Sequence, residues 1–360
     1  MNQTRVSIFG PTKSDRSKSM HIYTKRIFES LRNIESNRYS FELHKLTDCR
    51  LPLVKNVISK EFFYPIYAFF KRGAINHIAD HSYGSLAFWL NKKNTVVTCH
   101  DLTPLVFREQ SSLLGQIRFR INILAMKRVA NIIAVSKSTA KQLREIIRYN
   151  GNIHVVHNGI DPRFVNITNE ARLTEIKNKY KIKNKNIYLL HIGSSYPTKN
   201  IELMLRTMNK LPPNFHLIRV GTFTSKQEAE IAKLKLARRI LRFENLETSE
   251  LCELYNIADI FLFPSLYEGF GLPVLEAMAC SCPVICSNTT SLPEVGGDAP
   301  VYIDPSSETE LTKAILLVMN DKLLRRQMTE KGQRNIKRFS WEKTALSTLK
   351  VYDDILREER

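Results

Sequence analysis

The feature that most constrains the fold is a series of short, β-branched apolar segments, each of which ends in glycine or a polar residue. Strands that are apolar along their whole length are typical of a parallel sheet covered on both faces. We therefore predict strands at residues 6–10, 95–101, 132–136, 153–159, 188–193, 216–221, 260–265 and 283–287.

Segments with helical periodicity lie between these strands. Met20, Tyr23, Ile27 and Leu31 form one apolar stripe, and a capping-box sequence at 307–310 precedes another. Regular alternation of strand and helix predicts a doubly wound α/β architecture. In such sheets ligands bind beyond the carboxyl ends of the strands, so the residues there are the candidates for function.

The chain has 360 residues, a length that suggests about two domains. A polar stretch that begins with Asn-Gly and Asp-Pro at 158–162 is a candidate linker. We predict an N-terminal Rossmann-like domain at 1–165 and a C-terminal one at 166–342, facing each other across a ligand cleft. A helix at about 343–360 is expected to pack back on the first domain.

The positive charge is concentrated in the N-terminal half. The net charge is +19, and residues 1–165 carry 26 Lys and Arg against 11 Asp and Glu. This asymmetry favours an anionic partner, either nucleic acid or a membrane surface, although solubility alone could explain part of the excess. No recognised nucleic-acid module accompanies the basic residues, so we expect no nucleic-acid partner.

Several classes of protein are excluded. No apolar run approaches the roughly 18 residues of a spanning helix, and the N-terminus lacks a signal-peptide pattern. Cys280, Cys282 and Cys286 have no second pair to complete a zinc site, so we interpret them as buried thiols in a reducing compartment. We therefore expect a cytoplasmic protein.

The strongest motif is the segment 263–278, in which a strand ends and a loop with two glycines follows. Pro273 stands where a helix would begin, and the free N–H groups of a helix N-terminus suit a diphosphate. Glu268 and Glu276 would repel a phosphate, so they are better suited to sugar hydroxyls. The alternative is a surface turn with two solvated glutamates.

This segment, PSLYEGFGLPVLEAMAC, resembles the E-x7-E signature of the family-4 retaining glycosyltransferases, which have the GT-B fold. The segments VTCHDLTP at 97–104, IAVSKST at 133–139, VHNGID at 156–161 and FSW at 339–341 are similar to other family blocks in the same order. The resemblance implies transfer of a sugar from a nucleotide-diphosphate donor with retained anomeric configuration and without a metal.

The resemblance also implies roles for individual residues. Glu268 and His100 would contact the transferred sugar, Lys199 would neutralise the departing diphosphate, and Glu276 would bind ribose. The remaining donor-binding residues are Gly10, Gly193, Gly269, Phe270, Gly271 and Leu272.

One departure concerns the phosphate site. Members of the family often carry an arginine directly after the glycine or before the lysine, where this chain has Ser194 and Thr198. Arg219 is a candidate for the second cation. The altered arginine positions favour the alternative of a catalytically weak sugar-nucleotide-binding or scaffold protein. A GT-B sugar-nucleotide epimerase is a further alternative, which would not need a membrane-like surface.

The acceptor side is suggested by two segments. Aromatic residues crowd the run 62–70, which suits either a membrane interface or the core of the first domain. The segment 116–148 is strongly basic, and we assign Arg118, Arg120, Lys127 and Arg128 to a surface for anionic lipid. We predict a hexosyltransferase that uses GDP-mannose, or next UDP-glucose, on a saccharide or glycolipid acceptor at the cytoplasmic membrane face.

Overall fold

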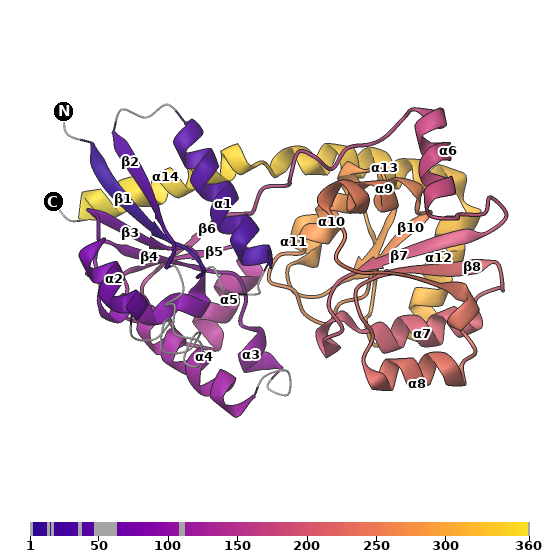
Figure 1. Ribbon diagram of the computed structural model, residues 1–360, viewed down its shortest axis with the longest axis horizontal. Coiled ribbons are helices and arrows are strands. Elements are labelled where there is room, and N and C mark those ends of the chain that lie inside the picture. The colour runs from indigo at the N-terminus through magenta and orange to yellow at the C-terminus, as the bar shows by residue number, and fades with distance from the viewer. Residues whose placement is uncertain are drawn as a thin grey trace. The chain divides into compact units, whose positions relative to one another are not determined.

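The computed structural model describes residues 3–12, 15, 18–34, 38–46, 63–107 and 112–358. It divides the chain into two compact units: residues 1–159 with 340–360, and residues 160–339. Each unit contains one parallel sheet of six strands with helices on both faces (Figure 1). The predicted α/β class with two Rossmann-like halves is confirmed.

The sheet of the first unit has the strand order β2-β1-β3-β4-β5-β6. Helices α1 and α14 pack against one face, and α2, α4 and the 3-10 helix η2 cover the other (Figure 1). The strands are β1 (Thr4–Phe9), β2 (Tyr39–His44), β3 (Ile75–Ile78), β4 (Thr95–Cys99), β5 (Asn131–Ala134) and β6 (Asn152–Val155). The helices are α1 (Lys18–Asn33), α2 (Tyr64–Phe70), η2 (His81–Phe88), α3 (Thr103–Val106), α4 (Leu113–Met126), α5 (Lys137–Glu145) and α14 (Trp341–Glu358).

The sheet of the second unit has the order β12-β11-β10-β7-β8-β9. Its strands are β7 (Ile187–Ile192), β8 (Phe215–Val220), β9 (Ile240–Phe243), β10 (Ile260–Phe263), β11 (Val284–Ser287) and β12 (Val301–Ile303). Its helices are α6 (Glu170–Lys179), η4 (Pro197–Lys199), α7 (Ile201–Lys210), α8 (Ser225–Lys233), η5 (Ala237–Arg239), α9 (Thr248–Ile257), α10 (Leu272–Ala279), α11 (Leu292–Gly296), α12 (Glu308–Asn320), α13 (Lys322–Asn335) and η6 (Ile336–Arg338).

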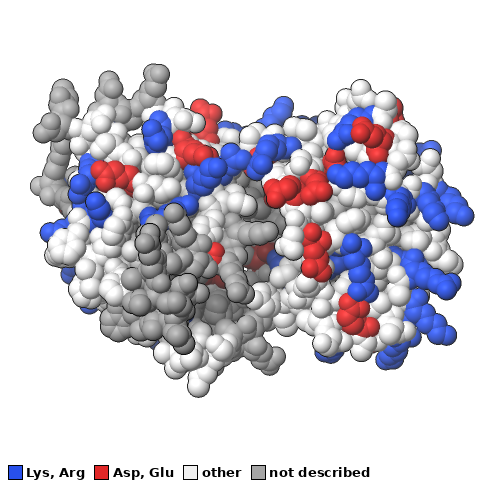
Figure 2. Space-filling view, in the orientation of Figure 1, with Lys and Arg blue, Asp and Glu red and all other residues white. Residues whose placement is uncertain are grey.

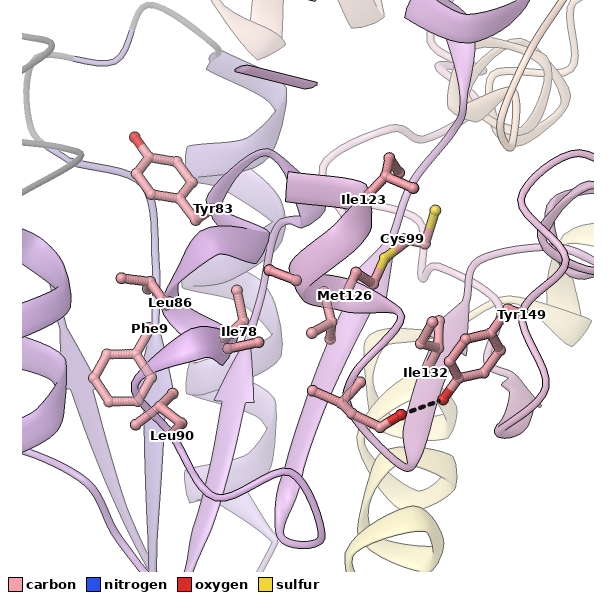
Figure 3. Close-up of a cluster of buried hydrophobic side chains, with 14 of the residues drawn as sticks. Phe9, Ile78, Tyr83, Leu86, Leu90, Cys99, Ile123, Met126, Ile132 and Tyr149 are labelled. Atoms are coloured by element: carbon pink, nitrogen blue, oxygen red, sulfur yellow. Dashed lines mark hydrogen bonds between the residues drawn. The ribbon is translucent and has the colours of Figure 1, made fainter. Parts of the chain in front are cut away.

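The hydrophobic core of the first unit shows why its strands read as continuous apolar runs. Figure 3 shows Phe9, Ile78 and Ile132 from three strands packed against Leu86 and Met126 from the helices on one face. On the other face, the predicted stripe of α1 buries Tyr23, Ile27 and Leu31 against the sheet and α14. Because both faces of the sheet are covered, both sets of alternating side chains are mostly apolar.

Strands β2, β3, β9 and β12 were not predicted from the sequence. Three of them lie at sheet edges, and each of these three is only partly buried. β3 is central but contains Asn76 and His77, both buried. The His77 ring nitrogens lie 2.7 Å from the hydroxyls of Tyr352 and Thr98, so hydrogen bonds from distant residues satisfy this polar strand.

The predicted capping box before α12 is half formed. The Ser307 hydroxyl accepts from the Glu310 N–H at 3.2 Å. The Glu310 carboxylate, however, accepts from the Asp304 N–H at 2.9 Å instead of returning to Ser307. The helix begins where the sequence predicts because one of the two reciprocal bonds suffices for the cap.

Candidate functional site

In the second unit the candidate residues meet at the carboxyl ends of β7 and β10. These two strands are neighbours, although the chain runs from β7 to β8 and β9 before it returns to β10 on the other side of β7. Such a reversal of strand order opens a crevice beyond the strand ends, which is where ligands bind in this architecture. Lys199 follows β7 in η4, and Glu268 follows β10.

The Lys199 and Glu268 side chains form an ion pair. The Nζ atom lies 2.5 Å from Glu268 Oε1, and the two side chains are 18% and 12% exposed. The ammonium also lies 5.0 Å from the centre of the Phe263 ring, within reach of a cation–π contact. Sixty-nine positions separate the pair in the sequence, so the fold alone brings them together.

The loop between β10 and α10 is held by hydroxyl groups that follow β11. The Thr290 hydroxyl accepts from the Glu268 N–H at 3.1 Å, and the Ser291 hydroxyl donates to the carbonyls of Glu268 and Phe270 at 3.1 and 2.8 Å. Gly271 caps α10 at φ +104°, a left-handed conformation that favours glycine. The loop is therefore fixed in one conformation at the start of the helix.

Glu276 projects from α10 and accepts a hydrogen bond of 2.9 Å from the Tyr255 hydroxyl of α9. Burial raises the pKa of Glu276 from its ordinary 4.5 to about 7; the Tyr255 hydrogen bond opposes this rise, and the negative charge of Asp161 adds to it. The carboxyl group therefore changes charge close to neutral pH. Its other oxygen, Oε1, is suited to hydrogen-bond a ligand hydroxyl.

Arg219, the candidate second cation, is completely buried on β8. Its guanidinium donates to backbone carbonyls of the loops after β7 and β8, including that of Gly193 at 2.8 Å. The side chain therefore lies beneath the loop rather than on its outer surface. Ser194 and Thr198 bring no charge to the same stretch.

In the first unit, Gly10 comes directly after β1 and His100 directly after β4. In the sheet, β3 lies between these two strands. The Tyr64 hydroxyl donates to the Gly10 carbonyl at 2.7 Å and fixes the chain where β1 ends. His100 is buried, its Nε2 lies 2.9 Å from the Ala79 carbonyl oxygen, and its ring packs edge-on against Tyr23 at 4.5 Å. Burial lowers the pKa of His100, so its imidazole is neutral at physiological pH.

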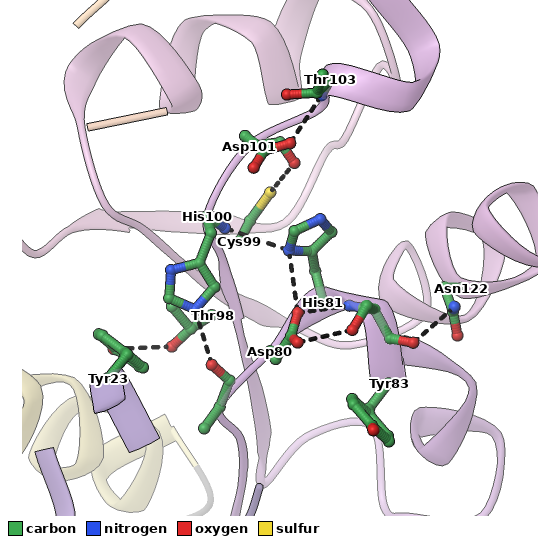
Figure 4. Close-up of polar contacts among 12 residues, drawn as sticks. Tyr23, Asp80, His81, Tyr83, Thr98, Cys99, His100, Asp101, Thr103 and Asn122 are labelled. Carbon is green, nitrogen blue, oxygen red and sulfur yellow. Dashed lines mark hydrogen bonds and ion pairs between the residues drawn. The ribbon is translucent and has the colours of Figure 1, made fainter. Parts of the chain in front are cut away.

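The structure adds Asp80 and His81, which the sequence analysis did not single out. They follow β3, and Figure 4 shows them beside His100. The His81 Nδ1 atom lies 3.5 Å from Asp80 Oδ1 and 3.3 Å from the His100 backbone nitrogen. Burial alone would raise the pKa of Asp80, but the neighbouring histidines and Ser82 hold it below its ordinary value. This pair was missed in the sequence analysis because β3, the strand after which the two residues lie, was not predicted.

The four cations assigned to a lipid surface lie on and just after α4, beside an exposed apolar stripe. Leu113, Leu114 and Leu124 are 74%, 73% and 60% exposed, and Ile117 and Ile121 continue the stripe. Arg120, Lys127 and Arg128 are exposed as well, and Arg118 is half-buried. On the face shown in Figure 2, lysine and arginine residues are interspersed with acidic residues on the described surface of both units.

The aromatic run is split between core and surface. Tyr64 of α2 is buried, whereas Phe63, Phe69 and Phe70 are exposed, and Phe62 lies outside the described residues. The core interpretation is therefore confirmed for Tyr64, and the exposed aromatics leave the membrane interpretation as a prediction. None of the helices that the structure describes is long and apolar enough to cross a membrane.

The cysteines that the structure describes are buried free thiols, among them Cys280, Cys282 and Cys286. Within the described residues, no group of three or more His, Cys, Asp and Glu side chains is arranged to hold a metal ion.

Two protein-family models match the chain. The model "Glycosyltransferase Family 4" matches residues 36–164, and "Glycosyl transferases group 1" matches residues 173–335. Together they cover most of both units.

Curated relatives and a solved structure are also similar. The Escherichia coli "Serotype-specific mannosyltransferase WbdA" is 30% identical over 284 residues, which are 74% of this chain and 34% of that protein. The E. coli "O-antigen chain mannosyltransferase B" is 37% identical over 172 residues, 46% and 45% of the two chains. The chain thus spans about a third to a half of the length of these relatives. Anabaena HepE, solved in complex with UDP and glucose, has a TM-score of 0.78 at 15% identity and covers 98% of this chain and 100% of its own.

Proposed function

The chain belongs to the family-4 glycosyltransferases with the GT-B fold, and from this we propose that it transfers a hexose from a nucleotide-diphosphate sugar with retention of anomeric configuration. The donor sugar that we favour is mannose, carried by GDP, because both reported relatives are named mannosyltransferases; UDP-glucose is next. We propose that the reaction needs no metal ion.

The observation that carries this proposal is the Lys199–Glu268 pair at the carboxyl ends of β7 and β10, close in sequence to the N-terminus of α10. A cation held within a pair can turn toward a phosphate oxygen as the bond between the sugar and the diphosphate breaks. The negative charge grows on the leaving group in that step, so a preorganised ammonium stabilises the transition state more than the bound donor.

Glu268 and Glu276 would then bind different parts of the donor. Glu268, freed from Lys199, would accept hydrogen bonds from hydroxyls of the transferred sugar. Glu276, one turn into α10, would accept hydrogen bonds from the ribose hydroxyls. The N–H groups of the loop 269–272 would bind sugar and phosphates, and the backbone at Gly10 and Gly193 would leave room for them. His100, neutral and buried, would donate or accept one hydrogen bond at the sugar.

The test uses the purified full chain with GDP-mannose and UDP-glucose, first by thermal shift and then by release of GDP or UDP without acceptor. An enzyme should hydrolyse one of the donors slowly, and Glu268→Gln should abolish the hydrolysis while the bare nucleotide still binds. Binding without hydrolysis would support the sugar-nucleotide-binding alternative, and a change of sugar configuration at the nucleotide would support the epimerase.

We further propose that the acceptor is a lipid-linked saccharide or glycolipid and that the first unit docks on the cytoplasmic face of an anionic membrane. The support is the exposed Leu/Ile stripe of α4 with cations at its side, and the exposed aromatics of α2. Each cation near an anionic surface contributes about 1 kcal/mol, and the apolar stripe would enter the headgroup region.

Co-sedimentation with vesicles tests the docking. Substitution of Arg118, Arg120, Lys127 and Arg128 by glutamine should reduce binding to anionic vesicles and leave nucleotide affinity unchanged. The matched control removes four exposed cations of the second unit, Lys181, Lys185, Lys226 and Arg238. Equal losses in both variants, or binding that ignores lipid charge and salt, would refute the docking surface.

A further inference from the structure

Arg219 is a buried cation that the proposed reaction does not yet use. Its side chain is completely buried, and among the described residues no carboxylate lies within ion-pair distance of it. Glu244 favours its charged form from farther away, but burial lowers the pKa of Arg219 to about 10. The guanidinium therefore stays charged at neutral pH in a place where a buried charge without a counterion is costly.

Backbone carbonyls partly compensate this charge. Nη1 donates to the carbonyls of Gly193 at 2.8 Å and Val220 at 2.6 Å, and Nη2 donates to those of Ser194 at 3.1 Å and Thr222 at 3.0 Å. One arginine thus ties the loop after β7 to the loop after β8. The Ser195 and Thr222 hydroxyl oxygens, 3.3 Å apart, join the same two loops.

These bonds determine which way the peptide groups of the β7 loop face. In a planar trans peptide the C=O and the following N–H point in opposite directions. Because the carbonyls of Gly193 and Ser194 point at Arg219, the N–H groups of Ser194 and Ser195 point away from it. Within the described part of the chain, no acceptor takes either N–H group.

The same loop lies against Lys199. A Cβ atom added at Gly193 would sit 3.4 Å from Lys199 Cε, so the lysine side chain runs alongside this glycine. The loop after β8 allows this close approach because residue 221 is a glycine. A Cβ atom at Gly221 would lie 2.2 Å from the Gly193 carbonyl oxygen, which is too close. The loop is thus held between the buried Arg219 and the side chain of Lys199.

We infer that Arg219 is a positioning residue for the diphosphate: it fixes the β7 loop so that the N–H groups of Ser194 and Ser195 bind a phosphate group next to Lys199. The inference rests on the proposed function and names the part of the ligand that this loop recognises. Successive backbone N–H groups that face outward make a concave anion site, and a fixed cation behind them strengthens it. No arginine on the loop itself is then required.

The test compares Arg219→Gln with Arg239→Gln. Arg239 is the matched control because it also donates to backbone carbonyls, those of Leu211, Pro212 and Phe215. It lies at the end of η5, just before the amino end of β9. Calorimetry on the full chain measures the affinity for GDP and UDP, with guanosine and uridine as ligands without phosphate. Arg219→Gln should weaken binding of the preferred nucleoside diphosphate about tenfold and leave its nucleoside unchanged; Arg239→Gln should change neither.

Several results separate the inference from simpler explanations. If Arg219→Gln weakens binding of the nucleoside and the nucleoside diphosphate equally, or if Arg239→Gln has the same effect, Arg219 only holds the two loops together and does not position a phosphate site. If Arg219→Gln does not fold, Arg219→Lys replaces it: this variant should bind GDP or UDP at least about threefold more weakly than wild type, and unchanged binding overturns the inference. A wild-type protein that binds neither nucleotide refutes the proposed function itself.

Discussion

Glu276 should destabilise the free protein near neutral pH. In the folded state its pKa is about 7, whereas its ordinary value is 4.5. The folded chain therefore binds more protons than the unfolded chain between these pH values, and the stability that this group contributes falls as the pH rises from 4.5 through 7. The rise in pKa from 4.5 to about 7, at about 1.4 kcal/mol for each tenfold change in proton affinity, corresponds to a penalty of at most about 3.5 kcal/mol at pH 8.

Glu276→Gln should remove this penalty, because the amide is neutral and its oxygen can still accept from the Tyr255 hydroxyl. We expect the variant to match wild type near pH 5 and to melt at most about 14 °C higher at pH 8, since 1 kcal/mol shifts Tm by about 2–4 °C in a unit of this size. Nucleotide affinity should fall at the same time, because the amide also presents two donors to the ribose.

The assay is differential scanning calorimetry of the full chain from pH 5 to 8, with Glu253→Gln as the control of opposite sign. Burial alone would raise the pKa of Glu253, but hydrogen bonds from Lys179 and Tyr180 hold it below its ordinary value. Its stabilisation is present above pH 4.5 and is lost as the pH falls through the lowered pKa, so the control should melt below wild type at pH 7. A Glu276→Gln difference that does not change with pH would refute the reasoning.

Three further predictions concern the rest of the site. Lys199→Ala should lower kcat for donor cleavage by roughly 10²–10³ with a smaller change in KM, measured in steady state; a change in KM alone would make Lys199 a ground-state anchor. Gly271→Ala should lower Tm and weaken nucleotide binding, because φ +104° costs a side chain about 1–3 kcal/mol; an unchanged melting curve would contradict this. Tyr64→Phe should cost about 1–3 kcal/mol in a denaturant titration, since the Gly10 carbonyl loses its buried donor, whereas the His44 carbonyl keeps the Gly10 N–H.

Much of the fold could be predicted because the strands are covered on both faces. Val6, Ile8 and Phe9 of β1 must all be apolar when helices pack on both sides, and this leaves a continuous signal in the sequence. The edge strands β2, β9 and β12 leave a weaker signal because part of each is exposed or polar. β3 was not predicted because it contains the polar residue His77. The hydroxyls that hydrogen-bond to His77 belong to Tyr352 and Thr98, which lie far away in the chain.

The sequence by itself also determined the chemistry available at the second unit, because a glycine loop, a helix-initiating proline and two glutamates eight positions apart are local features. Tertiary structure decided the rest. Pairing of Lys199 with Glu268 requires that β7 and β10 be neighbours, and the capture of four carbonyls by Arg219 requires two loops to meet. Distances across a sheet depend on strand order, and strand order comes from the packing of the whole chain rather than from any local pattern.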